Sequence, residues 1–196
     1  WDKAYSGRKK DEHFSLSDKP SEDLEKFTRY LEREHGRAFL NVQNSVLDLG
    51  CGNGRNLIYL AREFGMRGVG YDISEEAIKQ ARAMSSGLQL TYEVRSIAET
   101  LPLADASQTI VMDMMTSHFL RAGARATLLA EIARVLKPDG WLFYKTFLLD
   151  DDEHARRLLR DHPADEHGSY IHPDIGVLEH VCTQDEIEGA LNKHFT

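Results

Sequence analysis

A glycine-spaced turn between an apolar strand and an amphipathic helix constrains this chain more than any other feature. Residues 46–49 are apolar except for Asp48, and they lead into the run Asp48-Leu49-Gly50-Cys51-Gly52-Asn53-Gly54. Because glycine has no Cβ, Gly50, Gly52 and Gly54 can adopt backbone angles closed to other residues and let a ligand approach the main chain. The pattern predicts a strand, a ligand-binding turn and a helix. A turn that serves packing alone is the alternative.

Strand-like and helix-like segments alternate along the rest of the chain. Apolar residues recur at helical spacing in four segments, which are residues 21–34, 55–64, 74–84 and 122–136. Short apolar runs predict strands at residues 45–49, 68–71, 89–94, 109–112 and 141–147. Alternating strands and helices form βαβ units, so we expect an α/β fold, a Rossmann-like three-layer α/β/α sandwich with a mostly parallel sheet.

The connections and the C-terminal part are predicted from local signals. Residues 137–140, Lys-Pro-Asp-Gly, have the composition of a turn. A charged helix is expected at about 151–161, and residues 163–182 are expected to be irregular because they are rich in His, Pro and Gly. Thr183 and Glu186 have the spacing of a capping box that opens a last helix.

Composition predicts a cytoplasmic protein of one domain. The chain has 196 residues, of which 41% are hydrophobic and 29% charged, as in soluble globular proteins. No apolar run approaches the roughly 20 residues needed to span a bilayer, and no secretory signal is visible at the start. Cys51 and Cys182 lie far apart and make no disulfide framework, which favours a reducing compartment.

Charge argues against a nucleic-acid partner. The formal net charge is −8, and Arg and Lys cluster only mildly, at residues 8–10 and 156–157. A protein that binds nucleic acid usually presents a basic face, so we interpret both clusters as solvated surface charge. We expect a small-molecule substrate, no membrane partner, and a monomer or a homodimer.

The details of the glycine turn point to a family. The dinucleotide fingerprint is G-x-G-x-x-G, whereas here the third glycine comes one residue earlier and Asp48 precedes the first. An acid at that point suits a cationic ligand group better than a phosphate. The run resembles motif I of the class I S-adenosylmethionine-dependent methyltransferases, whose cofactor carries an amino group and a sulfonium and no phosphate.

That resemblance covers residues 45–147 and is closest to the small-molecule branch of the family. It implies S-adenosylmethionine as cofactor and in-line methyl transfer to a small-molecule acceptor. The cofactor contacts that it implies in the turn are Asp48, Gly50, Cys51, Gly52, Asn53 and Gly54. Cys51 also stands near a helix N-terminus, which can lower a thiol pKa, or it is simply a small residue that fills the loop.

Further cofactor contacts are expected at the ends of strands two and three. The carboxylate of Asp72 can accept hydrogen bonds from both ribose hydroxyls, although an acid facing the dipole of the following helix is the alternative. Ile73 would pack on the adenine. The segment with Ser96, Ile97 and Ala98 resembles the family's adenine-edge segment. The family often has Asp where this chain has Ser96, whose hydroxyl accepts more weakly, and the backbone of Ile97 is an alternative contact.

Strand four leads into the expected methyl-transfer region. Asp113 and Met114 are expected to contact the cofactor there, although methionines at such positions commonly belong to the core. The Asn/Asp-Pro-Pro-Tyr/Phe motif of DNA and amide N-methyltransferases is missing, which argues against those substrates. His118 is the first candidate for a general base and His180 the second, because imidazole titrates near neutrality. A structural role is the alternative for each.

Other substrate contacts are expected around the end of strand five. Lys145 could meet an anionic group of the substrate or extend to solvent. Tyr170 and His172 lie in a segment where loops carry specificity. His172 and His180 form no recognised metal motif, so no metal is expected. Tyr5, with Trp1, could close over the cofactor, or both could anchor the first helix.

We therefore divide the chain into an N-terminal helical lid (1–44), a cofactor-binding core (45–147) and a C-terminal substrate-side segment (148–196). The family pattern continues into two more strands, so we expect the C-terminal strands of the sheet to be truncated here. Two other functions remain open, together with a third option within the methyltransferases. A nicotinamide dehydrogenase would share the acidic ribose contact but should show G-x-G-x-x-G. A catalytically silent S-adenosylmethionine-binding partner would lack turnover, and an RNA or protein methyltransferase is disfavoured by the acidic charge.

Overall fold

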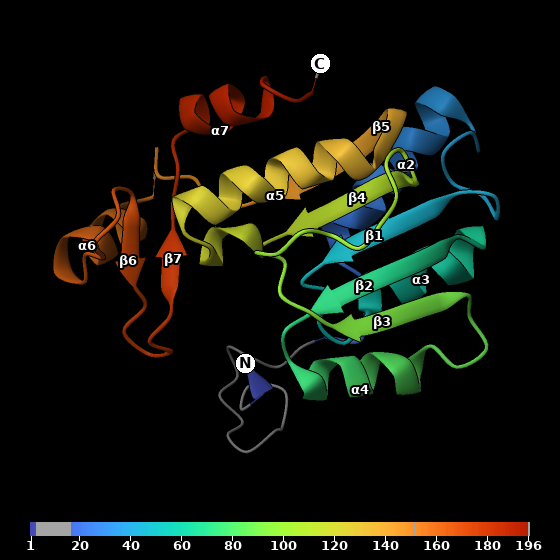
Figure 1. Ribbon diagram of the computed structural model, residues 1–196, viewed down its shortest axis with the longest axis horizontal. Coiled ribbons are helices and arrows are strands. Elements are labelled where there is room, and N and C mark those ends of the chain that lie inside the picture. Colours follow the sequence, from blue (N-terminus) through green and yellow to red (C-terminus); the bar gives the residue numbers. More distant parts are fainter. Residues whose placement is uncertain (3–16, 151, 196) are drawn as a thin grey trace.

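The central element is a five-stranded sheet in which every strand pair is parallel. The computed structural model describes residues 1–2, 17–150 and 152–195 (Figure 1). The strands are β1 (Ser45–Leu49), β2 (Arg67–Asp72), β3 (Leu90–Val94), β4 (Gln108–Met114) and β5 (Leu136–Lys145). Their order across the sheet is β3-β2-β1-β4-β5. The chain adds strands on one side of β1 as far as β3 and then crosses to the other side with β4, so the strand order reverses between β1 and β4. The predicted Rossmann-like α/β/α architecture is confirmed.

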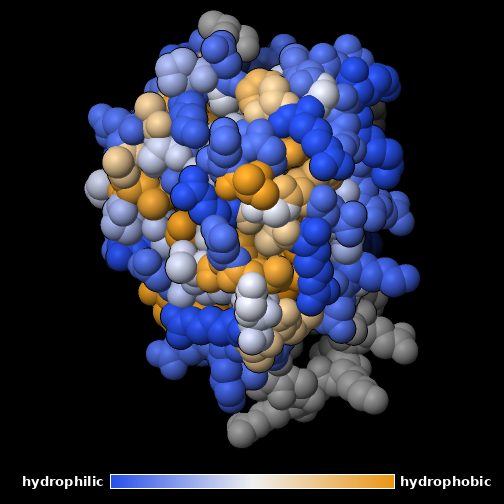
Figure 2. Space-filling model, turned by 90° about the vertical axis from the view of Figure 1, so that its right-hand side faces the viewer, coloured by the Kyte–Doolittle hydropathy of each residue, from blue (hydrophilic) through white to orange (hydrophobic). Residues whose placement is uncertain are grey.

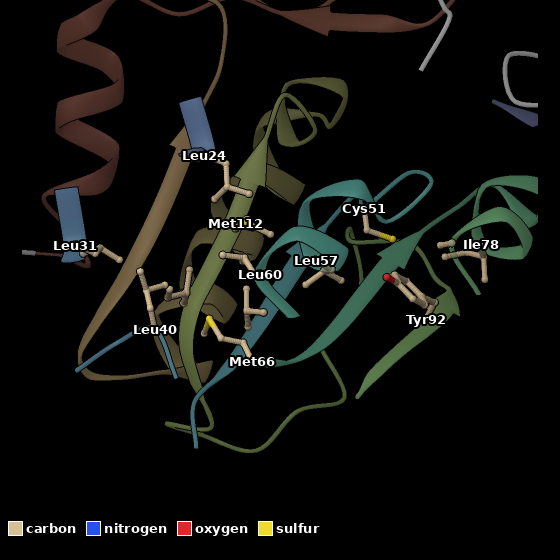
Figure 3. Packing of buried hydrophobic residues seen from close by; sticks show 13 residues of the cluster. Leu24, Leu31, Leu40, Cys51, Leu57, Leu60, Met66, Ile78, Tyr92 and Met112 are labelled. Carbon is tan, nitrogen blue, oxygen red and sulfur yellow. The ribbon is translucent and has the colours of Figure 1, made fainter. Parts of the chain in front are cut away.

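Helices cover both faces of this sheet because side chains alternate along each strand. Val46 and Met112 point toward α2 (Glu22–His35), α3 (Arg55–Phe64) and α4 (Glu75–Met84), and the resulting cluster contains leucines from α2 and α3 and Ile78 from α4 (Figure 3). Leu47 and Val111 point the other way, against the buried face of α5 (Ala122–Val135). The two cores together hold the carboxyl ends of the strands at one end of the sheet.

The local predictions hold best near the glycine turn. Strand β1 and helix α3 have the expected bounds, and α4 begins after Ser74, whose hydroxyl accepts from the backbone of Ala77. Residues 137–140 differ from expectation, because β5 already begins at Leu136 and the turn lies inside it. Pairing with β4 shifts register there, and Asp139 has a φ of 63°. The turn is thus an irregularity within a strand.

The expectation that residues 163–182 are irregular is wrong. They contain a two-stranded antiparallel hairpin, β6 (Ser169–Ile171) and β7 (Leu178–His180), which packs with α6 (Glu153–Asp161) around a small cluster of its own. Three-residue strands are too short to show an alternation in the sequence. The hairpin lies near the carboxyl ends of the sheet strands (Figure 1). Helix α7 (Gln184–Leu191) follows and has the predicted capping box at Thr183.

The opposite end of the sheet, where the strands begin, differs in the hydropathy of its surface. Figure 2 shows that this end is hydrophilic over most of its area, with apolar side chains gathered near its centre. Within the described parts of the chain, no helix is both long and apolar enough to cross a membrane.

Candidate functional site

A cavity of about 440 Å³ opens beyond the carboxyl ends of the strands. It lies where the strand order reverses, which is the usual ligand position in open parallel sheets. Most of its lining comes from the ends of β1, β2, β3 and β4, the segments that follow them and the first residues of α3. The lining residues are Trp1, Ser21, Gly50, Cys51, Gly52, Asn53, Arg55, Asn56, Asp72, Ile73, Arg95, Ser96, Ile97, Met114, Met115, Thr116, Phe119, Leu120, Lys145 and Val177.

The glycine turn is held tightly at the edge of this cavity. The backbone N–H groups of Gly50 and Cys51 both donate to the carbonyl oxygen of Tyr71, at 2.8 and 2.9 Å. Gly50 has a φ of 72°, and a Cβ at this position would lie 2.2 Å from Cγ2 of Thr116. A side chain is therefore excluded by the segment after β4, so that the main chain itself forms the cavity wall.

Asp72 is the one acidic residue among the described residues that line the cavity. It is 8% exposed, its Oδ2 accepts from the N–H of Gly52 at 2.9 Å, and its Oδ1 accepts from the N–H of Ser74 at 2.9 Å. Burial raises the pKa of this carboxyl, and the two backbone hydrogen bonds act in the opposite direction. Each oxygen keeps a lone pair for a further donor. Asp72 therefore combines both expected positions, at the start of α4 and at the cavity.

An apolar surface lies beside this acid. Ile73 is 54% exposed and lines the cavity, as does Ile97. A large exposed isoleucine within a cavity offers a flat apolar contact for a ring. Ser96 also lines the cavity, and its hydroxyl accepts from the N–H of Ala98 at 3.2 Å.

Asp48 and Asp113 are buried and do not line the cavity. They are 2% and 0% exposed, and Oδ2 of each has no hydrogen-bond partner among the described residues. Burial, with nearby Asp72 and Asp113, raises the pKa of Asp48 to about 7. Burial raises the pKa of Asp113 to about 6, against hydrogen bonds from Ser117. Both carboxyls therefore titrate near neutrality.

The other expected cofactor residues divide into three groups. Those that line the cavity are Gly50, Cys51, Gly52, Asn53, Asp72, Ile73, Ser96, Ile97 and Met114. Gly54 and Ala98 do not line it; Gly54 is the left-handed N-cap of α3, packed against the Tyr92 ring. Tyr5 lies outside the described residues. Burial raises the pKa of Cys51, which agrees with a residue that fills the loop rather than a reactive thiol.

The two candidate bases are placed away from the cavity lining. His118 is 2% exposed, and neither ring nitrogen has a partner within the described chain. Burial, with a smaller contribution from His180, lowers the pKa of His118 to about 4. The pKa of His180 is also lowered by burial, and its Nδ1 lies 3.0 Å from the hydroxyl of Ser169. Both imidazoles are therefore neutral at pH 7.

The expected substrate residues fall into two cavities. Lys145 lines the first one, and its Nζ lies 2.5 Å from Oδ2 of Asp23 in α2. Tyr170 and His172 line a second, smaller cavity that shares Trp1 and Phe119 with the first. No group of three or more His, Cys, Asp and Glu that could hold a metal ion occurs among the residues that the structure describes.

Several lining residues were not singled out from the sequence. Arg55 and Asn56 directly follow the glycine turn, and that adjacency was a usable signal. Arg95 follows β3 in the same way. Phe119, Leu120 and Val177 had no local signal, because only the tertiary fold brings them to the cavity.

Comparison with known proteins gives a consistent result. The profile of a methyltransferase domain matches residues 46–140. A solved S-adenosylmethionine-dependent methyltransferase from Methanosarcina mazei has 26% identity and a TM-score of 0.68, with 81% of each chain covered.

Two curated relatives extend this comparison. The glycine/sarcosine/dimethylglycine N-methyltransferase of Actinopolyspora halophila is 30% identical over 76% of this chain and 26% of its own length. The 27-O-demethylrifamycin SV methyltransferase of Amycolatopsis mediterranei is 32% identical over 70% of this chain and 51% of its own length. The chain thus spans between a quarter and about half of these relatives.

Proposed function

Because this chain belongs to the S-adenosylmethionine-dependent methyltransferases, we propose that it transfers a methyl group from S-adenosylmethionine to a small-molecule acceptor. The observation that carries the proposal is the arrangement at the reversal of strand order. There a buried carboxylate, an exposed isoleucine and a bare glycine backbone line one cavity. Its size of about 440 Å³ is typical of small-ligand sites.

The residues present fit this cofactor. Asp72 offers two oxygens, each fixed by a backbone donor, to a pair of ribose hydroxyls. Ile73 and Ile97 supply apolar contact for the adenine, with Ser96 at its edge. Three buried aspartates near the turn, Asp48, Asp72 and Asp113, make the surroundings favourable for a positively charged ligand.

The protein's part in the reaction is mainly positioning. The bound cofactor supplies an electrophilic methyl carbon on a sulfonium, and displacement leaves the bonding electron pair on sulfur. Gly50 and Gly52 let the backbone approach the ligand. Met114 and Thr116 form the cavity wall at the end of β4. Holding an acceptor in line can contribute about 7–11 kcal/mol. A base is needed only where the acceptor carries a proton on its reacting atom, and His118 stays the first candidate for that role.

The decisive experiment measures binding and turnover in one preparation. Calorimetry with S-adenosylmethionine and S-adenosylhomocysteine should give saturable binding of one ligand per chain. Turnover should then be followed as S-adenosylhomocysteine release with a panel of small amines, alcohols, thiols and carbon acids. Binding without turnover on any acceptor would favour a silent cofactor-binding partner. Absence of binding would refute the proposal.

A further inference from the structure

The second cavity, of about 220 Å³, is built by a different part of the chain from the first. Its walls come from the segment after β5, from α6 and from the β6–β7 hairpin. Trp1 and Phe119 line both cavities, and their rings meet edge to face with centroids 4.8 Å apart. This aromatic pair is therefore a common wall between the cofactor cavity and a neighbouring chamber.

Aromatic rings dominate the chamber. Trp1, Phe119, Phe147 and Tyr170 all line it, and they come from four separate segments. Trp1 is 40% and Phe147 38% exposed, so both present open ring surface. The negative face of an aromatic ring attracts a cation within about 6 Å of its centroid. Such walls suit either an apolar group or an organic cation.

The charge of a buried carboxylate favours the organic cation over the apolar group. Glu179 lines the chamber and is 6% exposed. Its Oε2 accepts a hydrogen bond from the hydroxyl of Tyr170 at 2.5 Å across the hairpin. Burial, and then the bond to Glu179, raises the pKa of Tyr170, so this phenol stays a neutral donor. No Lys, Arg or His of the described chain forms an ion pair with Glu179. A buried carboxylate without a cation is costly.

The remaining polar groups leave the chamber negative. Asp152 also lines it, with Oδ1 accepting from the N–H groups at the start of α6. Nδ1 of His172 accepts from the N–H of Asp174, and Nδ1 of His154 lies 3.3 Å from a guanidinium nitrogen of Arg157. Of the residues that the structure describes, no lysine or arginine lines the chamber.

We propose that this second cavity binds the positively charged ammonium group of the methyl acceptor, with Glu179 as counter-ion among four aromatic rings. This inference rests on the proposed function for the reaction that follows. The acceptor is then a small organic cation, whose reacting atom passes the Trp1–Phe119 pair to reach the first cavity. An apolar acceptor of the same shape leaves the charge of Glu179 without a counter-ion, and the site discriminates against it for that reason.

The experiment uses charged and neutral ligands of matched shape. Ethanolamine, dimethylethanolamine and choline are titrated by calorimetry into the whole chain saturated with S-adenosylhomocysteine, together with 3,3-dimethylbutan-1-ol, the neutral analogue of choline. At least one cation should bind, and choline should bind about tenfold or more tighter than its neutral analogue. Equal affinity for this pair, or no binding of any of the three cations, would overturn the inference.

Glu179→Gln removes the charge while its amide oxygen can still accept from Tyr170. We expect cation affinity to fall about tenfold or more, with affinity for the neutral analogue within about twofold. Glu188→Gln, on the exposed side of α7, is the matched control and should change neither. Unaltered cation binding in folded Glu179→Gln would show that Glu179 only joins β6 to β7.

A second variant keeps the test decisive if Glu179→Gln fails to fold. Phe147→Leu retains an apolar side chain but loses the ring, so selectivity for choline over its neutral analogue should fall by about threefold. Unchanged selectivity would contradict the proposed cation site. S-adenosylhomocysteine affinity, measured in every variant, separates the two proposals. If the unmodified chain does not bind S-adenosylhomocysteine, the methyltransferase function is refuted. If it binds S-adenosylhomocysteine but none of the cations, only this inference is refuted.

Discussion

The role of Asp72 can be tested by replacing it with alanine, because its two expected positions predict different results. The change removes an acceptor that lines the cavity and also leaves the N–H groups of Gly52 and Ser74 without their carboxylate. If Asp72 binds the ribose, affinity for the cofactor must fall. If it serves only the start of α4, affinity is unchanged and stability alone is lowered.

The expected magnitudes follow from these contacts. A charge-assisted hydrogen bond contributes about 1.5–3 kcal/mol, so S-adenosylhomocysteine should bind about tenfold to a hundredfold more weakly. Of the two orphaned donors, Gly52 faces the cavity, where water can reach it. Counting the Ser74 donor in full at about 1–3 kcal/mol, we expect the free energy of unfolding to fall by about 2 kcal/mol.

Glu75→Ala is the matched control, because Glu75 is an exposed acid in the first turn of α4 that does not line the cavity. It should lower stability by about 0.3–1 kcal/mol and leave cofactor affinity unchanged. Calorimetry and urea unfolding of both variants give the comparison. Folded Asp72→Ala with normal affinity would remove Asp72 from the binding site and leave only its contact with α4.

Three further predictions concern residues at the same end of the sheet. Gly52 has a φ of 55° and lines the cavity, so Gly52→Val should abolish cofactor binding while circular dichroism keeps its native shape; normal binding, or an unfolded variant, would contradict this. The pKa of Asp48 rises from its usual 3.8 to about 7 in the folded chain, so the folded state holds a proton that the unfolded chain releases. The contribution of Asp48 to the free energy of unfolding should therefore be largest below pH about 4 and decline toward pH about 7, by at most about 1.4 kcal/mol per pH unit, and the difference between the unmodified chain and Asp48→Asn in urea unfolding series should show this decline. If His118 removes a proton from the acceptor, His118→Gln should lower kcat by about 10²–10⁴ with S-adenosylhomocysteine affinity within about twofold, and an unchanged kcat would leave transfer to positioning alone.

The cofactor side of the site could be predicted from the sequence because its determinants are local. The strand, the glycine turn and α3 are consecutive, and Gly50 and Gly52 stand where the backbone must be bare. Asp72 follows an apolar run, so its position at a strand end was readable without knowing the sheet order. Each of these residues is placed by its nearest neighbours in the chain.

The acceptor side could not be predicted in this way. Phe119 and Val177 line the first cavity only because the hairpin packs against the segment after β4. The hairpin strands have three residues each, too few for a periodic signal. His118 lies in the segment that the sequence indicated, but its side chain is buried outside the cavity lining. Side-chain direction, rather than position in the chain, decides such cases.

The aromatic pair Trp1–Phe119 has a consequence for how binding in the two cavities is coupled. Since the same two rings bound both cavities, a ligand that shifts them from one side alters the free energy of binding on the other. Such coupling is reciprocal, so whatever factor one ligand imposes on the affinity of the second is returned unchanged. The two rings thus give this chain a physical basis for cooperative binding of the two ligands.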